Sequence, residues 1–334
     1  MPSADLRSHV RLVHFLTLVL AIHSLPVQAN QQPQSAPPCN AVTGAPPIET
    51  VTPVTKKVAC QGGRLLRFDQ GGVERYACLN LPAQAMRPQE QSTRKWPLVI
   101  YLHASLTTPA SLYKEGKDLF ELHDTYSLSN DENVKGFILL APEGRRAKVW
   151  PGGNGATQTG FRWDEWHRDP VTNLDAAAID HFLDETIATG LVDTRRVYVF
   201  GWSNGGFMAA LYGVWRGDRV AAIGQYASAS PWERPPCPVP LPANPHIPLV
   251  LIRNLCDRVA PCTETSAWIS ELTSAGWPFE SYNLWNDGSE APAAQTCAKN
   301  CSPAQGVEDH VRWPKGSVLK NRLLPFFKQH MKEK

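Results

Sequence analysis

A serine, a histidine and a carboxylate can together carry out nucleophilic catalysis, and the sequence holds a candidate for each. The serine is Ser203, in the segment VYVFGWSNGGFMAALYG at residues 197–213. GWSNG follows the pattern G-x-S-x-G, which places a serine on a strained turn between a strand and a helix. Glycines such as Gly201 and Gly205 flank the serine because side chains there would collide with the neighbouring strand and helix. We therefore predict that Ser203 is a nucleophile.

The carboxylate expected to orient the histidine is Asp257. In proteins with this serine turn, the acid follows the serine and the histidine comes last. Asp257 lies in NLCDRVAPC, directly after the apolar run at residues 247–254. A turn-forming role is the alternative interpretation of this residue. The rival carboxylates downstream of the serine are Asp287, Glu308 and Asp309.

The base is expected to be His310, in GVEDHVRWPKG. We predict that this segment is a loop just before the last helix, which is where a histidine can reach a serine at the sheet edge. The alternatives are His246, which precedes a strand and is expected to be structural, and His330, which is expected to be solvated on the terminal helix.

Two backbone N–H groups are expected to bind the substrate oxygen that becomes negatively charged. One belongs to Asn204, the residue after the nucleophile. The other should come from the loop YLHASLTTP at residues 101–109, where Ser105 is the candidate and Leu106 the alternative.

Tryptophans adjoin these motifs. Trp202 precedes the nucleophile, Trp313 follows His310 closely, and Trp163 lies in FRWDEW at residues 161–166. We predict that these three bind a hydrophobic acyl or aryl group of the substrate. The alternative is that each ring only buries apolar area in the core.

Apolar runs that predict strands alternate with helical patterns, which indicates an α/β protein with a mostly parallel central sheet flanked by helices. The runs at 96–103 and 136–144 are continuously apolar, as in strands buried on both faces. Two strands joined at a Gly-Gly turn are predicted within 63–82. Helices are expected at 175–190, directly after Ser203 and within 317–334, where Pro325 kinks or restarts the helix. Further strands are expected at 196–201, 220–228, 247–254 and 279–285.

The N-terminal residues have the three-part pattern of a secretory signal peptide. Arg7 and Arg11 precede the apolar stretch at 12–22, and small residues precede a cleavage site near Ala29. The apolar stretch is shorter than the roughly 20 residues that span a bilayer, so a membrane anchor is the less favoured alternative. We predict a signal peptide at 1–29, a proline-rich mobile leader at 30–56 and a catalytic domain at 57–334, secreted to an extracellular or periplasmic compartment.

The composition narrows the classes of partner and cofactor. The 334 residues are 43% hydrophobic and carry a formal charge of +2, and we find no basic tract for a nucleic acid and no second apolar run for a membrane. All eight cysteines follow the predicted cleavage site, which favours disulfides in an exported chain. Cys297 and Cys301 could pair with each other or elsewhere, and zinc is the competing interpretation. We expect no metal and no cofactor.

With these residues in hand, the chain resembles the polyhydroxybutyrate depolymerase-like esterases of the α/β-hydrolase fold, a group that also includes feruloyl and acetylxylan esterases. The matching stretches are PLVIYLHAS, FRWDEW, VDTRRVYVFGWSNGGFMAALYG, the Asp257 loop and HVRWP, and together they cover most of residues 96–330. Two positions depart from the family pattern. His103 is followed by Ala104 where the family has glycine, and FRWDEW replaces a CWNW-like motif.

The resemblance implies a triad of Ser203, Asp257 and His310 that hydrolyses carboxylic esters, such as hydroxyalkanoate oligomers or short acyl esters. Feruloyl or acetylxylan ester hydrolysis is an alternative. A secreted serine peptidase and a non-catalytic binding protein of the same fold are further alternatives.

Overall fold

The computed structural model describes residues 39–40, 44, 48, 50–51, 58–91, 93–149, 158–234, 237–243 and 247–333. All of them belong to the compact unit Pro37–Lys334. The expected signal peptide, the boundaries at residues 29 and 56, and His246 lie outside the described residues.

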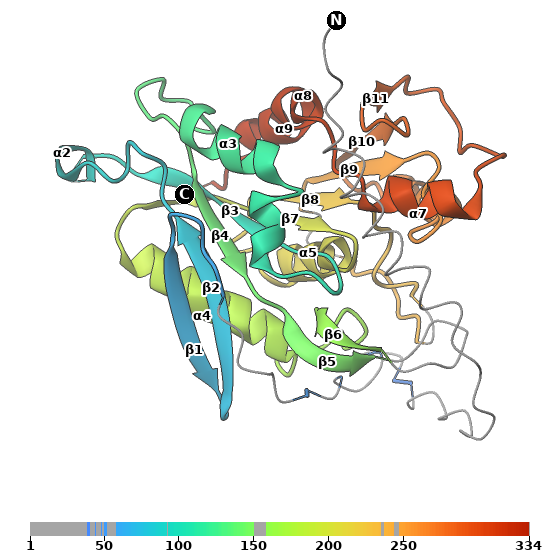
Figure 1. The fold of residues 1–334 in the computed structure, drawn as a ribbon, viewed down its shortest axis with the longest axis horizontal. Coiled ribbons are helices and arrows are strands. Elements are labelled where there is room, and N and C mark those ends of the chain that lie inside the picture. The colour runs from blue at the N-terminus through green and yellow to red at the C-terminus, as the bar shows by residue number, and fades with distance from the viewer. Residues whose placement is uncertain are drawn as a thin grey trace, which may run out of the picture. The chain divides into compact units, whose positions relative to one another are not determined.

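The described strands form one large sheet in the order β1-β2-β4-β3-β7-β8-β9-β10-β11 (Figure 1). Every neighbouring pair from β4 to β10 is parallel, and antiparallel pairs occur at the two edges. The predicted mostly parallel α/β sheet is therefore confirmed. Its strands are β1 (Arg64–Gln70), β2 (Val73–Asn80), β3 (Trp96–Leu102), β4 (Ile138–Pro142), β7 (Val192–Trp202), β8 (Ala222–Tyr226), β9 (Leu249–Asn254), β10 (Phe279–Leu284) and β11 (Glu290–Ala291).

Two further strands, β5 (Arg145–Val149) and β6 (Gln158–Arg162), form a separate antiparallel ribbon. The predicted Gly-Gly turn joins β1 and β2. Gly71 and Gly72 have φ values of 65° and 84°, the left-handed backbone that such a two-residue hairpin turn requires.

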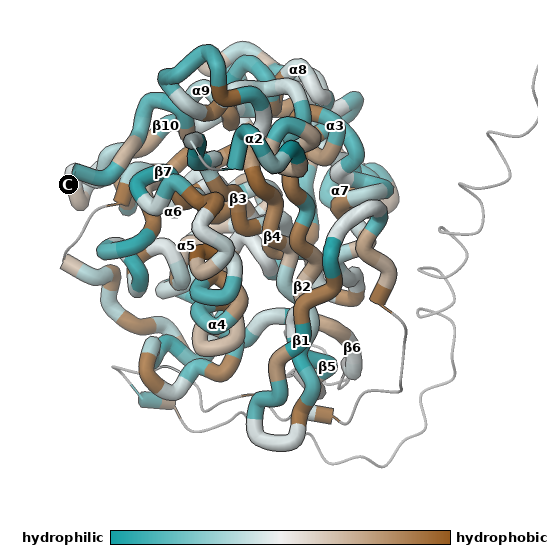
Figure 2. The backbone as a smooth tube through the Cα atoms, turned by 90° about the vertical axis from the view of Figure 1, so that its left-hand side faces the viewer, coloured by the Kyte–Doolittle hydropathy of each residue, from teal (hydrophilic) through white to brown (hydrophobic). Residues whose placement is uncertain are grey.

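Side chains of the central strands alternate between two hydrophobic cores, one on each face of the sheet. In β3, Leu98 and Ile100 belong to one core, whereas Val99 and Tyr101 belong to the other. All seven residues of β3 are buried, which explains its continuous apolar run. Figure 2 shows the same pattern, with hydrophobic segments at β3 and β4 inside the molecule and more hydrophilic segments along the surface helices.

Helices cover both faces of the sheet. Side chains of α4, α5 and α6 pack into one core, and side chains of α3 and of the C-terminal helices pack into the other. Within the described residues, no helix combines the length and the apolar character needed to cross a bilayer. The helices are α2 (Pro88–Gln91), α3 (Lys117–Thr125), α4 (Leu174–Ala188), α5 (Asn204–Trp215), α6 (Cys262–Ser274), α7 (Pro303–Val311), α8 (Gly316–Val318) and α9 (Leu324–Gln329), with a 3₁₀ helix at Pro109–Tyr113 and a π-helical turn at Leu319–Leu323.

The cysteines pair into four disulfides, Cys39–Cys237, Cys60–Cys78, Cys256–Cys301 and Cys262–Cys297. These bonds occupy all eight thiols, so none is available as a zinc ligand, and Cys297 does not pair with Cys301.

Part of the segment expected to be a mobile leader contacts the domain. Cys39 is bonded to Cys237, and the buried Ile48 donates its N–H to Asp164 Oδ2 at 2.9 Å. A covalent bond and a hydrogen bond to a buried carboxylate therefore hold these two residues, which the proline-rich composition alone did not indicate.

Candidate active site

Ser203 occupies the predicted turn between β7 and α5. Its φ is 55°, a left-handed value that is strained for a residue with a side chain. Backbone hydrogen bonds hold it there, because its N–H donates to Tyr226 O at 2.8 Å and its carbonyl accepts from Gly206 N at 2.8 Å and from Phe207 N at 3.2 Å.

The flanking glycines are required by close backbone contacts. A Cβ on Gly201 would lie 1.9 Å from Gly205 O, and a Cβ on Gly205 would lie 2.1 Å from Leu102 O. Both distances are far below van der Waals contact, so the helix can approach the strands this closely only without side chains at these positions.

The structure brings the three sequence-predicted side chains together. His310 Nε2 lies 2.8 Å from Ser203 Oγ, and His310 Nδ1 lies 2.7 Å from Asp257 Oδ2. The imidazole therefore bridges a hydroxyl and a carboxylate that are far apart in the sequence. His310 and Asp257 are buried, while Ser203 is partly exposed.

His310 does not lie in a loop as predicted but in the last turn of α7. Ser302 caps this helix by accepting from Gln305 N at 3.1 Å, and Pro303 occupies the first turn, where a proline is well tolerated. The Ser-Pro pair is the sequence signal for this helix start, and the prediction of a loop overlooked it.

Backbone donors orient Asp257. Its Oδ1 accepts from Val259 N at 2.8 Å and from Ala260 N at 2.9 Å, which leaves Oδ2 for the imidazole. The turn-forming arrangement expected as an alternative thus coexists with the contact to His310.

The rival residues lie elsewhere. Asp287 is exposed and pairs with Lys315, which lowers the pKa of Asp287. Glu308 pairs with Arg312, and His330 contacts Phe326 O through its ring. Asp309 is buried, and its Oδ2 has no hydrogen-bond partner among the described residues. Burial raises the pKa of Asp309 to about 6.

Two disulfides connect the Asp257 loop to the chain that leads into α7. Cys256 immediately precedes Asp257 and pairs with Cys301, and Cys262, the first residue of α6, pairs with Cys297. Both ends of the carboxylate loop are thus bonded covalently to the segment that precedes the helix of His310.

The loop after β3 lies against the β6 strand. Leu106 has a φ of 63°, and its N–H donates to Phe161 O at 2.8 Å. Among the described residues, Ser105 N has no such backbone acceptor. The strained position in this loop is Leu106, whereas Ala104 does not have a positive φ, so the departure from glycine at Ala104 imposes no left-handed strain.

His103 anchors this loop from inside. Its ring is fully buried, Nε2 accepts from Gly144 N at 2.9 Å, and Nδ1 lies 2.8 Å from Ala104 O. These partners assign the proton to Nδ1. Burial lowers the pKa of His103 to about 4, so the ring is neutral at neutral pH.

The Asn204 side chain joins the serine turn to the FRWDEW segment. Its Oδ1 accepts from Trp163 N at 2.7 Å, and its Nδ2 donates to Trp163 O at 3.1 Å and to Glu165 Oε2. Sequence reasoning assigned only the backbone of Asn204 and missed Glu165, because nothing in the local pattern indicates that these residues meet.

The three predicted tryptophans differ in exposure. Trp163 is fully buried and donates to His103 O at 2.8 Å, and Trp202 is nearly buried and donates to His310 O at 3.2 Å. These contacts position the loops, and the buried rings have no free surface for a substrate. Trp313 is partly exposed, and its ring packs against Trp202 with centroids 5.6 Å apart.

A buried ion-pair network holds Asp164 of the FRWDEW segment. Arg145 contacts both Asp164, at 3.3 Å, and Asp175, at 3.1 Å, and Arg75 contacts Asp175 at 2.8 Å. Burial alone would raise the pKa of Asp175, but the two guanidinium groups lower it overall. Removing one partner from such a network leaves a buried charge unpaired, which is strongly destabilising.

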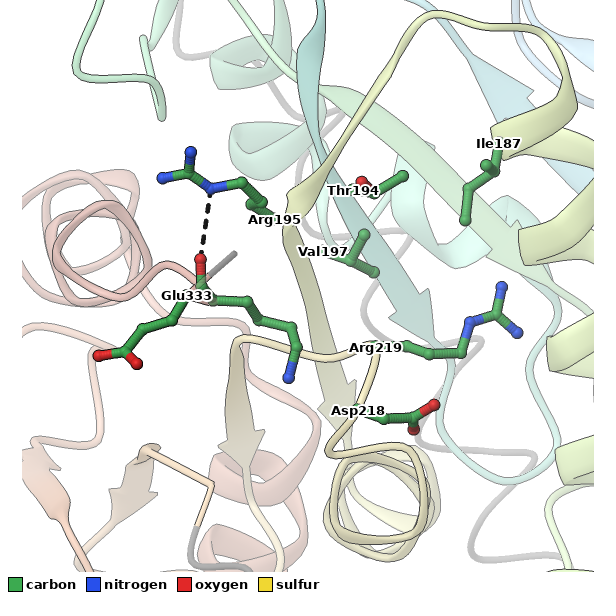
Figure 3. A pocket seen from close by; sticks show the side chains of 8 residues that line it. Ile187, Thr194, Arg195, Val197, Asp218, Arg219 and Glu333 are labelled. Carbon is green, nitrogen blue, oxygen red and sulfur yellow. Dashed lines mark hydrogen bonds between the residues drawn. The ribbon is translucent and has the colours of Figure 1, made fainter.

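A surface cavity of about 440 Å³ lies at the opposite end of β7 (Figure 3). Its lining includes Thr194, Arg195 and Arg219. Val197 also lines the cavity, and the path from Val197 along the regular part of β7 to Ser203 spans six residues, or roughly 20 Å at about 3.3 Å per residue, so this cavity is separate from the candidate active site. The described residues contain no group of three or more histidines, cysteines or carboxylates placed to hold a metal ion.

Comparison with known proteins gives a partial family match. The model of the prolyl oligopeptidase family matches residues 145–234, a span that includes Ser203 but less than half of the chain. No curated protein sequence matches the chain.

Solved structures are similar to this chain at low sequence identity. A thermostable esterase has a TM-score of 0.51 at 16% identity, covering 82% of this chain and 64% of its own. A ferulic acid esterase has a TM-score of 0.50 at 13% identity, covering 80% of this chain and 97% of its own. The acylaminoacyl peptidase of Pyrococcus horikoshii has a TM-score of 0.47 at 14% identity, covering 81% of this chain and 42% of its own. The chain thus spans less than two thirds of the thermostable esterase and of the peptidase.

The nine-stranded sheet of the described residues, the serine turn after β7 and the likeness to these structures agree on the architecture. The resemblance to feruloyl esterase-like proteins is confirmed at the level of the fold, and the chain is an α/β-hydrolase by fold.

Proposed function

We propose that this protein is a secreted serine carboxylesterase that uses Ser203, His310 and Asp257 as a catalytic triad. The observation that carries the proposal is the continuous hydrogen-bonded chain from Ser203 Oγ through His310 to Asp257, with distances of 2.8 and 2.7 Å. Such geometry allows the imidazole to take the hydroxyl proton while the carboxylate stabilises the imidazolium that forms.

In the first half of the reaction, His310 Nε2 takes the proton from Ser203 Oγ as this oxygen attacks the ester carbonyl carbon. The oxyanion accepts hydrogen bonds from the backbone N–H of Asn204 and of Ser105, since Leu106 N–H is already used by Phe161 O. The bond to the alcohol oxygen then breaks, and His310 gives the proton to the departing alcohol.

In the second half, His310 takes a proton from water, and the hydroxide attacks the carbonyl carbon of the acyl-enzyme. Breaking the bond between this carbon and Ser203 Oγ releases the carboxylic acid and returns the proton to the serine. Trp202 supports both halves by holding the backbone of His310.

The proposed substrates are hydroxyalkanoate oligomers or other short acyl esters, with Trp313 as the substrate contact among the three predicted tryptophans. Feruloyl or acetylxylan esters are the alternative substrates. Four disulfides are typical of proteins made in an oxidising compartment, which supports the proposed export.

Peptide hydrolysis is a second candidate, favoured by the match of residues 145–234 to the prolyl oligopeptidase family. Rates with p-nitrophenyl butyrate and with a peptide anilide distinguish the two candidates. We expect faster hydrolysis of the ester, and a preference for the anilide would support the peptidase instead.

The catalytic assignment is tested with a fluorophosphonate probe and with Ser203→Ala. The wild type should be labelled and the variant should not, and kcat should fall roughly 10⁴-fold or more. Equal labelling of both proteins, or labelling of neither, would remove Ser203 as the nucleophile.

A further inference from the structure

Two arginines share one buried carboxylate beside the serine turn. Arg162 Nη2 lies 3.9 Å and Arg234 Nη2 lies 3.5 Å from Glu165 Oε1. Glu165 is completely buried, and Arg162 is 8% exposed. The formal net charge of the three side chains is +1, and burial raises the pKa of the Glu165 carboxyl.

The hydrogen-bonding capacity of these arginines is underused. A guanidinium has five N–H donors, and buried donors are normally satisfied. The Nε atoms of Arg162 and Arg234 are buried and have no hydrogen-bond partner among the described residues. The contacts to Glu165 are at or beyond the outer limit of a hydrogen bond.

Aromatic rings hold both guanidinium groups in place. The Arg162 guanidinium lies 4.8 Å from the centroid of the Trp166 ring, and that of Arg234 lies 4.1 Å from the centroid of Phe207. Arg168 adds a third positive charge that interacts with Glu165 and Arg234, and its own donors go to backbone carbonyls such as Pro231 O at 2.6 Å, which carry no charge to neutralise it. Glu165 Oε1 likewise has no hydrogen-bond partner among the described residues, so ion-pair and ring contacts rather than hydrogen bonds hold this positively charged region.

This cluster adjoins the nucleophile. Glu165 accepts from the side chain of Asn204, the residue after Ser203. Phe207, which lies under the Arg234 guanidinium, donates its N–H to Ser203 O at 3.2 Å. Phe207 is four positions after Ser203, a rise of about 6 Å along the helix axis. The Arg234 side chain is 28% exposed, so solvent and a substrate can reach it.

We propose that Arg234, with Arg162, binds a free carboxylate on the substrate, so that the preferred esters carry an acid group close to the scissile bond. A substrate carboxylate would accept hydrogen bonds from the terminal nitrogens of the partly exposed Arg234 guanidinium, in the planar geometry that arginine recognises, and the charge of Arg162 would add to the attraction. Half-esters of dicarboxylic acids and oligomers of hydroxy acids with a free end belong to this class. The inference rests on the proposed ester hydrolysis and specifies its substrates.

The experiment compares the monomethyl and dimethyl esters of succinic, glutaric and adipic acids at pH 8, where the free acid is ionised. The measured quantity is the ratio of kcat/KM for the half-ester to that for the diester, counted per ester group. In the wild type we expect a ratio of about 10 or more for at least one chain length. A ratio of 1 or less at every length would overturn the proposal.

Variants assign the preference to the cluster. Arg234→Gln should bring the ratio close to 1, and Arg234→Lys should retain part of it. The matched control is Arg195→Gln, at the far end of β7, which should keep the wild-type ratio. Using a ratio cancels any general loss of activity, and an unchanged ratio in Arg234→Gln would refute the assignment.

A failure of the proposed function is distinguishable. If neither class of ester is hydrolysed, binding of monomethyl adipate and dimethyl adipate to the Ser203→Ala protein is measured by calorimetry. Tighter binding of the half-ester, lost in the Ser203→Ala/Arg234→Gln protein, would support the carboxylate site. Equal binding would reject it.

Discussion

Replacing His103 with glutamine tests how burial of this ring makes the fold sensitive to acid. The pKa of His103 is about 4 in the folded chain because the ring is buried, and 6.5 is its ordinary value. Above pH 6.5 the ring is neutral in both the folded and the unfolded chain. Between pH 6.5 and about 4 only the unfolded chain binds the proton, so the free energy of unfolding falls as the pH falls.

The magnitude follows from the difference between the two pKa values. At about 1.4 kcal/mol for each pH unit, the wild type should lose about 3 kcal/mol through this ring between pH 7 and pH 4. Glutamine does not titrate, and its Oε1 can replace Nε2 as the acceptor for the N–H of Gly144. His103→Gln should therefore lack this part of the acid sensitivity, even if lost packing against Trp163 lowers its stability at pH 7.

The assay is urea unfolding of both proteins at several pH values from 4 to 8, followed by tryptophan fluorescence. The difference in free energy of unfolding between wild type and variant should shrink by about 3 kcal/mol as the pH falls from 7 to 4. Other titrating groups cancel in this difference. Parallel stability curves over the whole range would refute the reasoning about the buried neutral ring.

Three further changes have defined outcomes. Gly201→Ala places a Cβ 1.9 Å from Gly205 O and should destabilise the fold by at least about 3 kcal/mol, measured by denaturant unfolding. Cys256→Ala with Cys301→Ala should lower kcat/KM about 10- to 100-fold because the carboxylate loop is no longer bonded to the chain that precedes α7. Asp309→Asn should stabilise the protein by up to about 3 kcal/mol above pH 7, with no gain below pH 4, because burial raises the pKa of Asp309 from 3.8 to about 6.

Matched comparisons separate these effects from general instability. Removal of the Cys60–Cys78 bond is the control for the variant that lacks the Cys256–Cys301 bond. The Cys60–Cys78 bond lies in a different part of the chain, so its loss should leave kcat/KM unchanged. An equal loss of activity in both disulfide variants would contradict the positioning role. For Asp309→Asn, a stabilisation that does not depend on pH would contradict the role of the buried charge.

Local patterns in the sequence were sufficient for the parts of the fold that depend on near neighbours. The glycines around Ser203 predicted the strained turn because the residues that would collide lie within a few positions or on the adjoining strand. Continuous apolar runs predicted β3 and β4 because a strand buried on both faces has no solvent-facing positions that favour polar side chains. The order of the triad is satisfied by Asp287, Glu308 and Asp309 as well, so the position of Asp257 directly after the apolar run at 247–254 was the signal that favoured it over these rivals.

Other features depend on contacts between distant segments, and only the tertiary structure reveals them. The pairing of eight cysteines has many solutions in sequence, and the fold selects one by bringing specific thiols together. The helical position of His310 was missed because its capping signal is short. Burial of Trp163 and Trp202 could not be predicted, since the residue type alone does not distinguish a tryptophan in the core from one that lines a cleft.

The sequence by itself determined which chemical groups are present, the serine turn and the alternation of strands and helices, because these depend on residue type and short spacing. The tertiary structure decided that His310 lies between Ser203 and Asp257 and that Arg162, Glu165 and Arg234 share one region beside the turn. Hydrogen bonds and charge interactions act over a few ångströms in space. Residues that are tens of positions apart in the chain meet at such distances only after the sheet has assembled.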